Sequence, residues 1–108
     1  MNYHVVFARQ ASCQLEAIRD YIAVAADPVT AERYVDAITD HCLDLDVFPH
    51  RGVQRGDLRP GLRTMSYRKR VTIAFAVDDD ARKVTIMGVF YGGQDLDAAF
   101  ASNDGDTD

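Results

Sequence analysis

Apolar residues recur at every third or fourth position in two segments of the first half of the chain, which is the spacing of an amphipathic helix. The two stripes are Leu15, Ile18, Ile22 and Ala25 in the first segment, and Ala31, Tyr34, Val35, Ile38, Cys42 and Leu45 in the second. They predict one helix over residues 9–25 and another from Pro28 to residue 46 or 47. Asp27 is suited to cap the second helix, and a proline is tolerated at its first position. Because the connection is short, we expect an antiparallel helical hairpin.

Apolar and polar residues alternate through much of the second half of the chain, and this two-residue period is typical of β-strands. It predicts strands in "LRTMSYR" (62–68), "RVTIAFAVD" (70–78) and "KVTIMGVFY" (83–91), and the run "YHVVFA" (3–8) predicts one more at the N-terminus. Val71, Ile73, Phe75 and Val77 are assigned to one face of their strand. In the last strand, Val84, Ile86, Gly88 and Phe90 are assigned to one face and Thr85, Met87, Val89 and Tyr91 to the other.

The resulting element order is β-α-α-β-β-β, which is an α+β fold. Three sequential strands with short turns predict an antiparallel sheet, and the N-terminal helical hairpin is expected to cover one face of it. Residues 49–61 are rich in glycine and proline, which predicts a loop. Residues 1–97 are expected to form a single domain, and the acidic tail at residues 98–108 is expected to be disordered.

Positive charge is concentrated in one segment of a chain whose net charge is −5. Residues 50–70 hold seven of the twelve Lys and Arg residues and a single acid, which is a balance of +6. Residues 1–49 carry three Arg against eight acids, and residues 71–108 carry two basic residues against eight acids. Concentrated arginine indicates an anionic partner, because the planar guanidinium forms paired hydrogen bonds with carboxylates and phosphates. The alternative is that these arginines solubilise a loop or pair with the protein's own acids.

The second predicted helix carries an acidic ridge, which consists of Glu32, Asp36, Asp40 and Asp44 at every fourth position. Like charges at this spacing cost roughly 0.2–0.5 kcal/mol per pair. The ridge is either a solvated face or a surface along which something basic lies.

Several classes of site are not indicated by the sequence. Cys13 and Cys42 are too few and too far apart for a zinc site, and the three histidines form no ligand spacing. There is no glycine-rich phosphate loop, and no apolar run approaches the ~20 residues that span a membrane. We therefore expect no metal, no cofactor, no membrane span, a cytoplasmic location, and two cysteines that are not linked.

Four fragments in the right order resemble the RelE/ParE superfamily of toxin–antitoxin toxins, and its ParE branch more closely. They are "LEAIRDYIA", "AERYVDAITDHCLDLDVFPHRG", "RPGLRTMSYRKRVTIAFAVD" and "VTIMGVFYGGQDL", and the resemblance covers residues 3 to about 97. It implies the toxin of a type II system, neutralised by a ParD-like antitoxin whose ribbon-helix-helix half binds DNA and whose tail wraps the toxin. It also implies contact with DNA only through the antitoxin, and inhibition of DNA gyrase without catalysis by the toxin itself.

Two alternatives stay open. RelE-like relatives cleave mRNA in the ribosome, which requires cations at the phosphate and a group that moves a proton. Cations are present, but tyrosines such as Tyr67 and Tyr91 are poor bases at neutral pH. Residues 92–108 also lack the basic and aromatic cluster with which many RelE-like nucleases end. Gln94 stands where many ParE relatives have arginine, which keeps open an inactive module that only binds its antitoxin.

We predict a binding surface for the antitoxin or target that consists of Arg59, Arg63, Met65, Tyr67, Arg68, Lys69, Arg70 and Tyr91. Met65 and Tyr67 are expected on the sheet face that the helices leave open, where a peptide can dock. Tyr21 and Tyr34 are expected in the core. Arg63, held by a strand, is expected to matter more for antitoxin binding than a loop arginine such as Arg51, because a fixed, desolvated ion pair is worth more than an exposed one.

Overall fold

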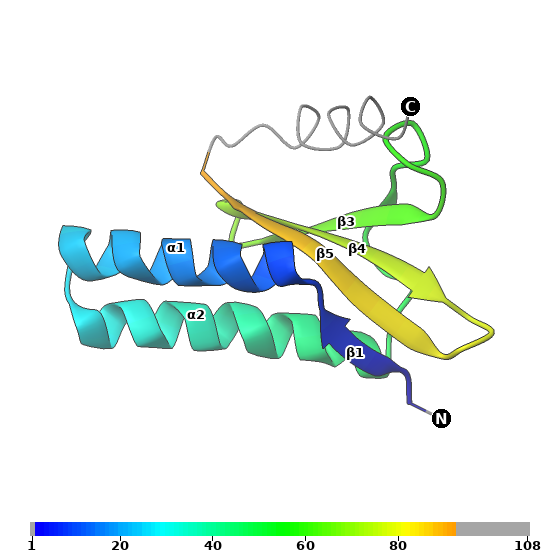
Figure 1. Ribbon diagram of the computed structural model, residues 1–108, viewed down its shortest axis with the longest axis horizontal. Helices are drawn as coiled ribbons and strands as arrows, with labels where there is room; N and C mark the ends of the chain where they lie inside the picture. The colour runs from blue at the N-terminus through cyan, green and yellow to red at the C-terminus, as the bar shows by residue number, and fades with distance from the viewer. Residues whose placement is uncertain (1, 93–108) are drawn as a thin grey trace.

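The two helices stack on one face of a five-stranded sheet in a computed structural model that describes residues 2–92 (Figure 1). The elements are β1 (His4–Phe7), α1 (Arg9–Ala25), α2 (Pro28–Leu43), a 3₁₀ turn (Asp44–Asp46), β2 (Val53–Gln54), β3 (Leu62–Tyr67), β4 (Val71–Asp78) and β5 (Lys83–Tyr91). The predicted fold class and element order are confirmed, with the short strand β2 added. The expected disorder of residues 98–108 and the role of Gln94 lie outside the described residues.

The helical hairpin forms from local signals that the sequence carries. Asp27 caps α2 by accepting a hydrogen bond from the backbone N–H of Thr30 at 2.8 Å, and Pro28 is the first helical residue. The buried stripes are Ala11, Leu15, Ile18 and Ile22 in α1, and Ala31, Val35, Ile38 and Cys42 in α2. The 3₁₀ turn buries Leu45 and ends the helical segment before Pro49.

The sheet has the strand order β1-β5-β4-β3-β2 and is mostly antiparallel. β3, β4 and β5 form the predicted meander, but β1 pairs in parallel with β5, with His4 opposite Lys83. The long connection through the helices and the meander permits this parallel pairing. The sequence did not indicate which strand β1 pairs with, so this parallel pair is an addition to the predicted meander. Assigning all of residues 49–61 to a loop is wrong, because Val53 and Gln54 pair with β3; two residues are too short a run to show a period.

A β-bulge in β5 changes which of its residues face the helices. The pairing with β4 skips Met87, and an extra residue of this kind reverses the alternation that follows it. Val84 and Ile86 lie in the main core before the bulge, and Val89 lies there after it. Phe90 instead belongs to a small cluster with Leu62 and Ala74, away from the main core. The prediction that Phe90 shares a face with Val84 and Ile86 is wrong for this reason.

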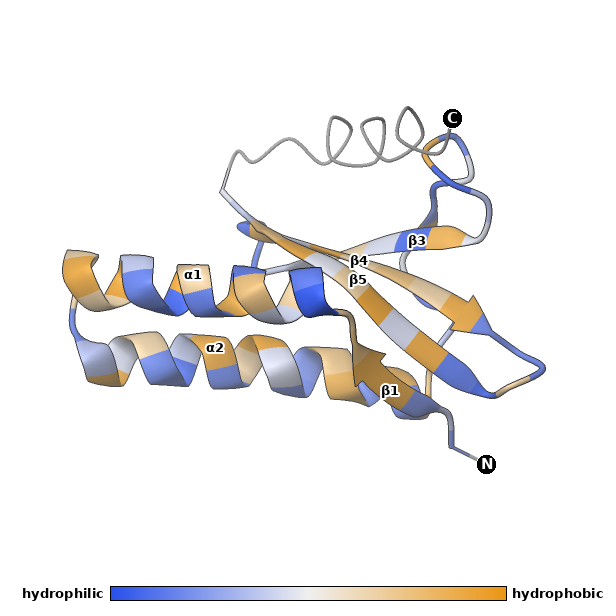
Figure 2. Ribbon diagram, viewed as in Figure 1, coloured by the Kyte–Doolittle hydropathy of each residue, from blue (hydrophilic) through white to orange (hydrophobic). Residues whose placement is uncertain are grey.

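The main core lies between the helices and the sheet, where apolar positions of both alternate with polar ones along each element (Figure 2). Met65 is only 8% exposed and belongs to this core, so the prediction that it lies on the open face of the sheet is wrong. Tyr67 lies two residues further along the same face of β3 and packs against the same core and Tyr34 of α2, so the same prediction is wrong for Tyr67. Tyr21, which was expected in the core, is 61% exposed, so that prediction is wrong.

Candidate functional site

Met65 is buried in the main core, and the other predicted binding residues are divided between the two ends of β3. Arg63 is its second residue and Tyr67 its last, so about 13 Å of strand separates them at ~3.3 Å per residue. Arg59 precedes β3 at the Arg63 end. The basic turn, which we define as Arg68, Lys69 and Arg70, follows β3 at the other end, where Tyr91 of β5 pairs with the first residue of β4. The structure therefore forms two candidate sites rather than one surface.

At the first end, Arg63 lines a polar pocket of about 330 Å³. The other lining residues are His50, Gln54, Gly56, Gly61, Leu62, Val77 and Asp79. The partly buried guanidinium of Arg63 donates a hydrogen bond from Nη1 to the backbone carbonyl of Arg51 at 3.2 Å. This bond ties the strand to the loop that follows α2, which gives Arg63 a structural role there.

Asp79 organises one wall of the same pocket. Its carboxylate accepts a hydrogen bond from the Tyr3 hydroxyl at 2.7 Å and lies 2.8 Å from Nε2 of His50. These interactions favour the ionised carboxylate, so they lower the pKa of Asp79, with the bond from Tyr3 as the largest cause. An imidazole oriented by a carboxylate is a proton-moving group that inspection of the sequence did not identify. Residues 29 apart give no pattern that would have revealed it.

Arg59 lies in the loop before β3, where its backbone N–H donates to the carbonyl of Arg55 at 3.2 Å. The side chain of Arg55 forms an ion pair with Asp57 at 3.0 Å. Local contacts thus fold this loop on itself and engage part of the positive charge that the sequence concentrates here.

The basic turn at the other end of β3 has an unusual backbone for its residues. Arg68 and Lys69 have φ values of 52° and 61°, and the N–H of Arg70 donates to the carbonyl of Tyr67 at 3.2 Å. Two central residues with positive φ are typical of a type I′ hairpin turn, where asparagine and glycine are favoured. Two long basic side chains therefore occupy positions at which smaller residues would be more stable.

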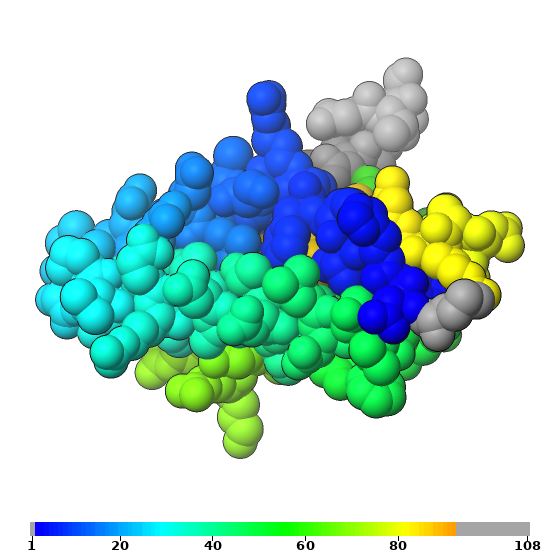
Figure 3. Space-filling model, turned by 90° about the horizontal axis from the view of Figure 1, so that it is seen from below, coloured from blue at the N-terminus to red at the C-terminus, as the bar shows by residue number. Residues whose placement is uncertain are grey.

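All three side chains of the basic turn are exposed. Within residues 2–92, no carboxylate lies at ion-pair distance from any of them. The space-filling view shows this segment, in lime green, projecting beside α2 (Figure 3). The charge of the turn is thus available to another molecule.

Five rings form an aromatic cluster behind the basic turn. The centroid distances are 5.8 Å for Tyr21–Tyr91, 5.9 Å for Tyr91–Tyr34, 6.2 Å for Tyr34–Tyr67 and 5.3 Å for Tyr67–His41. Tilted and edge-on contacts of this kind stabilise the rings beyond the area that they bury. The cluster joins α1, α2, β3 and β5, and it holds the strand end from which the basic turn departs.

Tyr34 lies at the centre of the aromatic cluster. Its hydroxyl is buried and has no hydrogen-bond partner among the described residues. Burial is the largest cause that raises the pKa of Tyr34, the neighbouring Tyr91 and Tyr67 add to the increase, and Arg70 and Arg68 oppose it. Tyr34 is therefore neutral at physiological pH, and the charges of the basic turn act directly on it.

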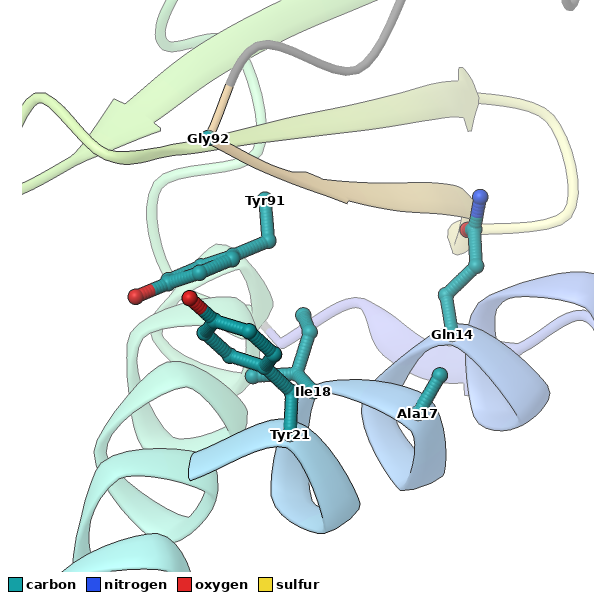
Figure 4. A pocket seen from close by; sticks show the side chains of 6 residues that line it. All are labelled: Gln14, Ala17, Ile18, Tyr21, Tyr91 and Gly92. Atoms are coloured by element: carbon teal, nitrogen blue, oxygen red, sulfur yellow. The ribbon is translucent and has the colours of Figure 1, made fainter. Parts of the chain in front are cut away.

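A groove of about 360 Å³ lies between α1 and the end of β5 (Figure 4). It is lined by Gln14, Ala17, Ile18, Tyr21, Tyr91 and Gly92. The rings of Tyr21 and Tyr91 lie close together at one end, and Gln14 lies at the other. Oε1 of Gln14 accepts a hydrogen bond from the backbone N–H of Val89 at 2.7 Å, which fixes α1 against β5. The mostly apolar lining suits an apolar side chain rather than an anion.

Other kinds of site find little support in the part of the chain that the structure describes. Residues 2–92 contain no group of three or more His, Cys, Asp or Glu that could hold a metal ion. Cys13 is exposed and Cys42 is buried, and neither is in a disulfide. None of the described helices is both long enough and apolar enough to cross a bilayer.

The sequence matches the family model described as ParE toxin of type II toxin-antitoxin system, parDE, over residues 5–96. The resemblance that the sequence fragments indicated is confirmed by this match. No match was found among curated proteins.

Solved structures share the fold at low sequence identity. A structure of the chromosomal ParDE system from Pseudomonas aeruginosa superposes with a TM-score of 0.72 at 23% identity, over 83% of this chain and 96% of that one. The RelBE2 toxin–antitoxin complex from Mycobacterium tuberculosis gives 0.65 at 21% identity, over 87% and 95% of the two chains. A double mutant of the Escherichia coli toxin RelE in the free state gives 0.67 at 13% identity, over 96% and 98%.

Proposed function

This chain belongs to the family of ParE toxins of type II toxin–antitoxin systems, and on that premise we propose that a ParD-like antitoxin holds it inactive. Two of the similar solved structures are described as the ParDE system and the RelBE2 toxin–antitoxin complex, which supports a partner of this kind. We further propose that an acidic segment of the antitoxin binds the basic turn.

The observation that carries this proposal is the state of the basic turn itself. Its three basic side chains are exposed and form no ion pair within residues 2–92, and two of the three residues, Arg68 and Lys69, have positive φ. Unfavourable backbone conformations that persist in a structure often mark a binding surface. Charge-assisted hydrogen bonds to carboxylates would make use of these side chains.

The antitoxin proposal is tested with the toxin and the protein encoded beside it. Replacing Arg68, Lys69 and Arg70 together by Ala should weaken the complex strongly in calorimetric titration, and added salt should weaken the wild-type complex more than that of the variant. Wild-type affinity and salt dependence in the triple variant would contradict the assignment of the basic turn.

The contribution of Arg63 stays a prediction. Arg63→Ala is expected to weaken antitoxin binding more than Arg51→Ala. The variant also loses the hydrogen bond to the carbonyl of Arg51, so its stability must be measured beside its affinity. A loss of affinity that follows only from unfolding would remove Arg63 from the binding surface.

We propose DNA gyrase as the target, supported by membership of the ParE family rather than by the fold, which does not choose an activity. Purified toxin should inhibit gyrase supercoiling, the antitoxin should relieve the inhibition, and expression without antitoxin should induce DNA-damage signalling while bulk mRNA stays intact. Codon-positioned cleavage of translated messages with unaffected gyrase would contradict this target.

One observation favours a second candidate, a ribosome-dependent mRNA endonuclease. The pair of His50 and Asp79 lies beside Arg63 in one pocket, so a proton-moving group and a cation share a site. If this candidate holds, His50→Ala should abolish mRNA cleavage while Lys69→Ala leaves it largely intact. A chain that affects neither gyrase nor mRNA, and only binds its antitoxin, would be the inactive module.

A further inference from the structure

A slot of about 220 Å³ separates α2 from the basic turn. It is lined by Thr30, Arg33, Tyr34 and Ala37 from α2 and by Tyr67 and Arg68 from the end of β3 and the turn. The rings of Tyr34 and Tyr67 and the methyl group of Ala37 supply apolar walls. No sequence pattern indicated that Arg33 lies near the basic turn, which begins 35 residues later.

An arginine from each of the two elements lines the slot. Arg33 and Arg68 are exposed, and within residues 2–92 neither forms an ion pair. The guanidinium of Arg68 lies 5.4 Å from the centroid of the Tyr67 ring, so it is placed against the apolar wall. The carboxylate of Asp27 accepts hydrogen bonds from the backbone N–H and the hydroxyl of Thr30 as the cap of α2 and forms no ion pair with Arg33.

The walls of the slot belong to rigid elements. Tyr34 and Tyr67 contact each other edge-on at 6.2 Å, and both pack against the main core. A site of this kind needs little ordering when it binds, so more of the contact energy appears as affinity. An apolar slot with a cation on each side fits an apolar side chain that has carboxylates beside it.

We infer that this slot receives an apolar side chain from an acidic peptide segment of the antitoxin, and that Arg33 and Arg68 bind carboxylates next to that side chain. The inference rests on the proposed function and adds the receptor on the toxin and the chemistry of the bound segment.

Nucleic acid is the less favoured occupant because of the charge beside the slot. The acidic ridge runs along a neighbouring face of α2, where Asp36 and Asp40 are exposed. The whole chain carries a net charge of −5. A phosphate backbone would meet this ridge, whereas a peptide can place acids at the slot and neutral or basic residues along α2.

The test is the affinity of toxin variants for the antitoxin encoded beside the toxin gene, measured by calorimetry. Arg33→Ala and Arg68→Ala each remove one flanking cation, and Ala37→Leu fills the slot without changing charge. Arg9→Ala is the matched control, because Arg9 is an exposed arginine of α1 that does not line the slot. We expect each slot variant to weaken binding about tenfold and the control to change it by less than about twofold. Circular dichroism and urea unfolding of each variant separate a binding defect from loss of the fold.

Each outcome has a distinct meaning. Equal effects of Arg33→Ala, Arg68→Ala and Arg9→Ala would overturn the inference in favour of general charge attraction. Wild-type affinity in a folded Ala37→Leu variant would overturn the slot as a receptor for a side chain. Binding of a short DNA duplex that is lost in the two slot arginine variants, with antitoxin binding unchanged, would overturn it in favour of nucleic acid. Failure of the wild-type toxin to bind the antitoxin would instead refute the proposed function.

Discussion

Lys69→Gly should make the free toxin more stable and its complex weaker. Lys69 has a φ of 61°, a region in which a side chain costs roughly 1–2 kcal/mol and glycine costs little. Glycine also gains freedom in the unfolded chain, which offsets about 0.5–1 kcal/mol of that relief. Lys69 is exposed and unpaired within residues 2–92, so no ion pair there is lost. We therefore expect the free energy of unfolding to rise by about 0.5–1 kcal/mol.

Two adjacent residues, Arg82 in the turn between β4 and β5 and Lys83 at the start of β5, provide matched controls. Arg82 has a φ of 53° and lies in the turn between those strands, so Arg82→Gly should stabilise the toxin by a similar amount. Lys83 follows it but pairs within the sheet with His4 and Asp78, so Lys83→Gly should destabilise by about 0.5–1 kcal/mol. Urea unfolding followed by circular dichroism should show these changes as shifts of the midpoint at constant slope.

The same variants separate backbone strain from binding. Lys69→Gly should weaken the antitoxin complex, whereas Arg82→Gly should leave it unchanged. A Lys69→Gly variant that is destabilised as much as Lys83→Gly would refute the strain reasoning. A stabilised Lys69→Gly variant with full antitoxin affinity would show that Lys69 is not retained for binding.

Three further predictions concern backbone conformation, thiol reactivity and acid stability. Gly52→Ala should lower the free energy of unfolding by about 1–3 kcal/mol, because φ is +79° and the new Cβ would collide with a backbone carbonyl of β3. Gly56→Ala, with open space around it, should change that energy by less than about 0.5 kcal/mol, and equal losses would contradict this account. A thiol reagent at neutral pH should modify Cys13 in the native toxin but Cys42 only after unfolding, because Cys42 is buried and burial raises its pKa to about 12. Mass spectrometry that finds equal labelling rates for the two cysteines, or a disulfide between them, would disprove this prediction. Hydrogen bonds from the start of α2 lower the pKa of Asp27, so its contribution to stability is present above the ordinary value of 3.8 and is lost as the pH falls through the lowered value. Asp27→Ala should flatten this part of the acid unfolding profile, and an unchanged profile would count against the cap.

The helices and the meander could be predicted from the sequence because their signals are local. The stripe of α1 and the cap of α2 depend on residues within a few positions of each other, and both helices begin where the sequence indicated. The alternation in β4 likewise places Ile73 and Phe75 on one face as predicted, and that face lies in the main core. The concentration of arginine in residues 50–70 was visible as well, since it requires only a count.

Only the tertiary structure decided how those elements combine. The bulge at Met87 reverses the faces of β5, and the position of the helical layer buries Met65 while it leaves Tyr21 exposed. The arginine segment is split by the length of β3, so Arg63 and the basic turn serve different sites. Arg33 of α2 joins Arg68 at the slot only because the hairpin packs against the end of the sheet. Periodicity reports the neighbours that a residue has along its own element, whereas these contacts depend on pairing and packing between residues far apart in the chain.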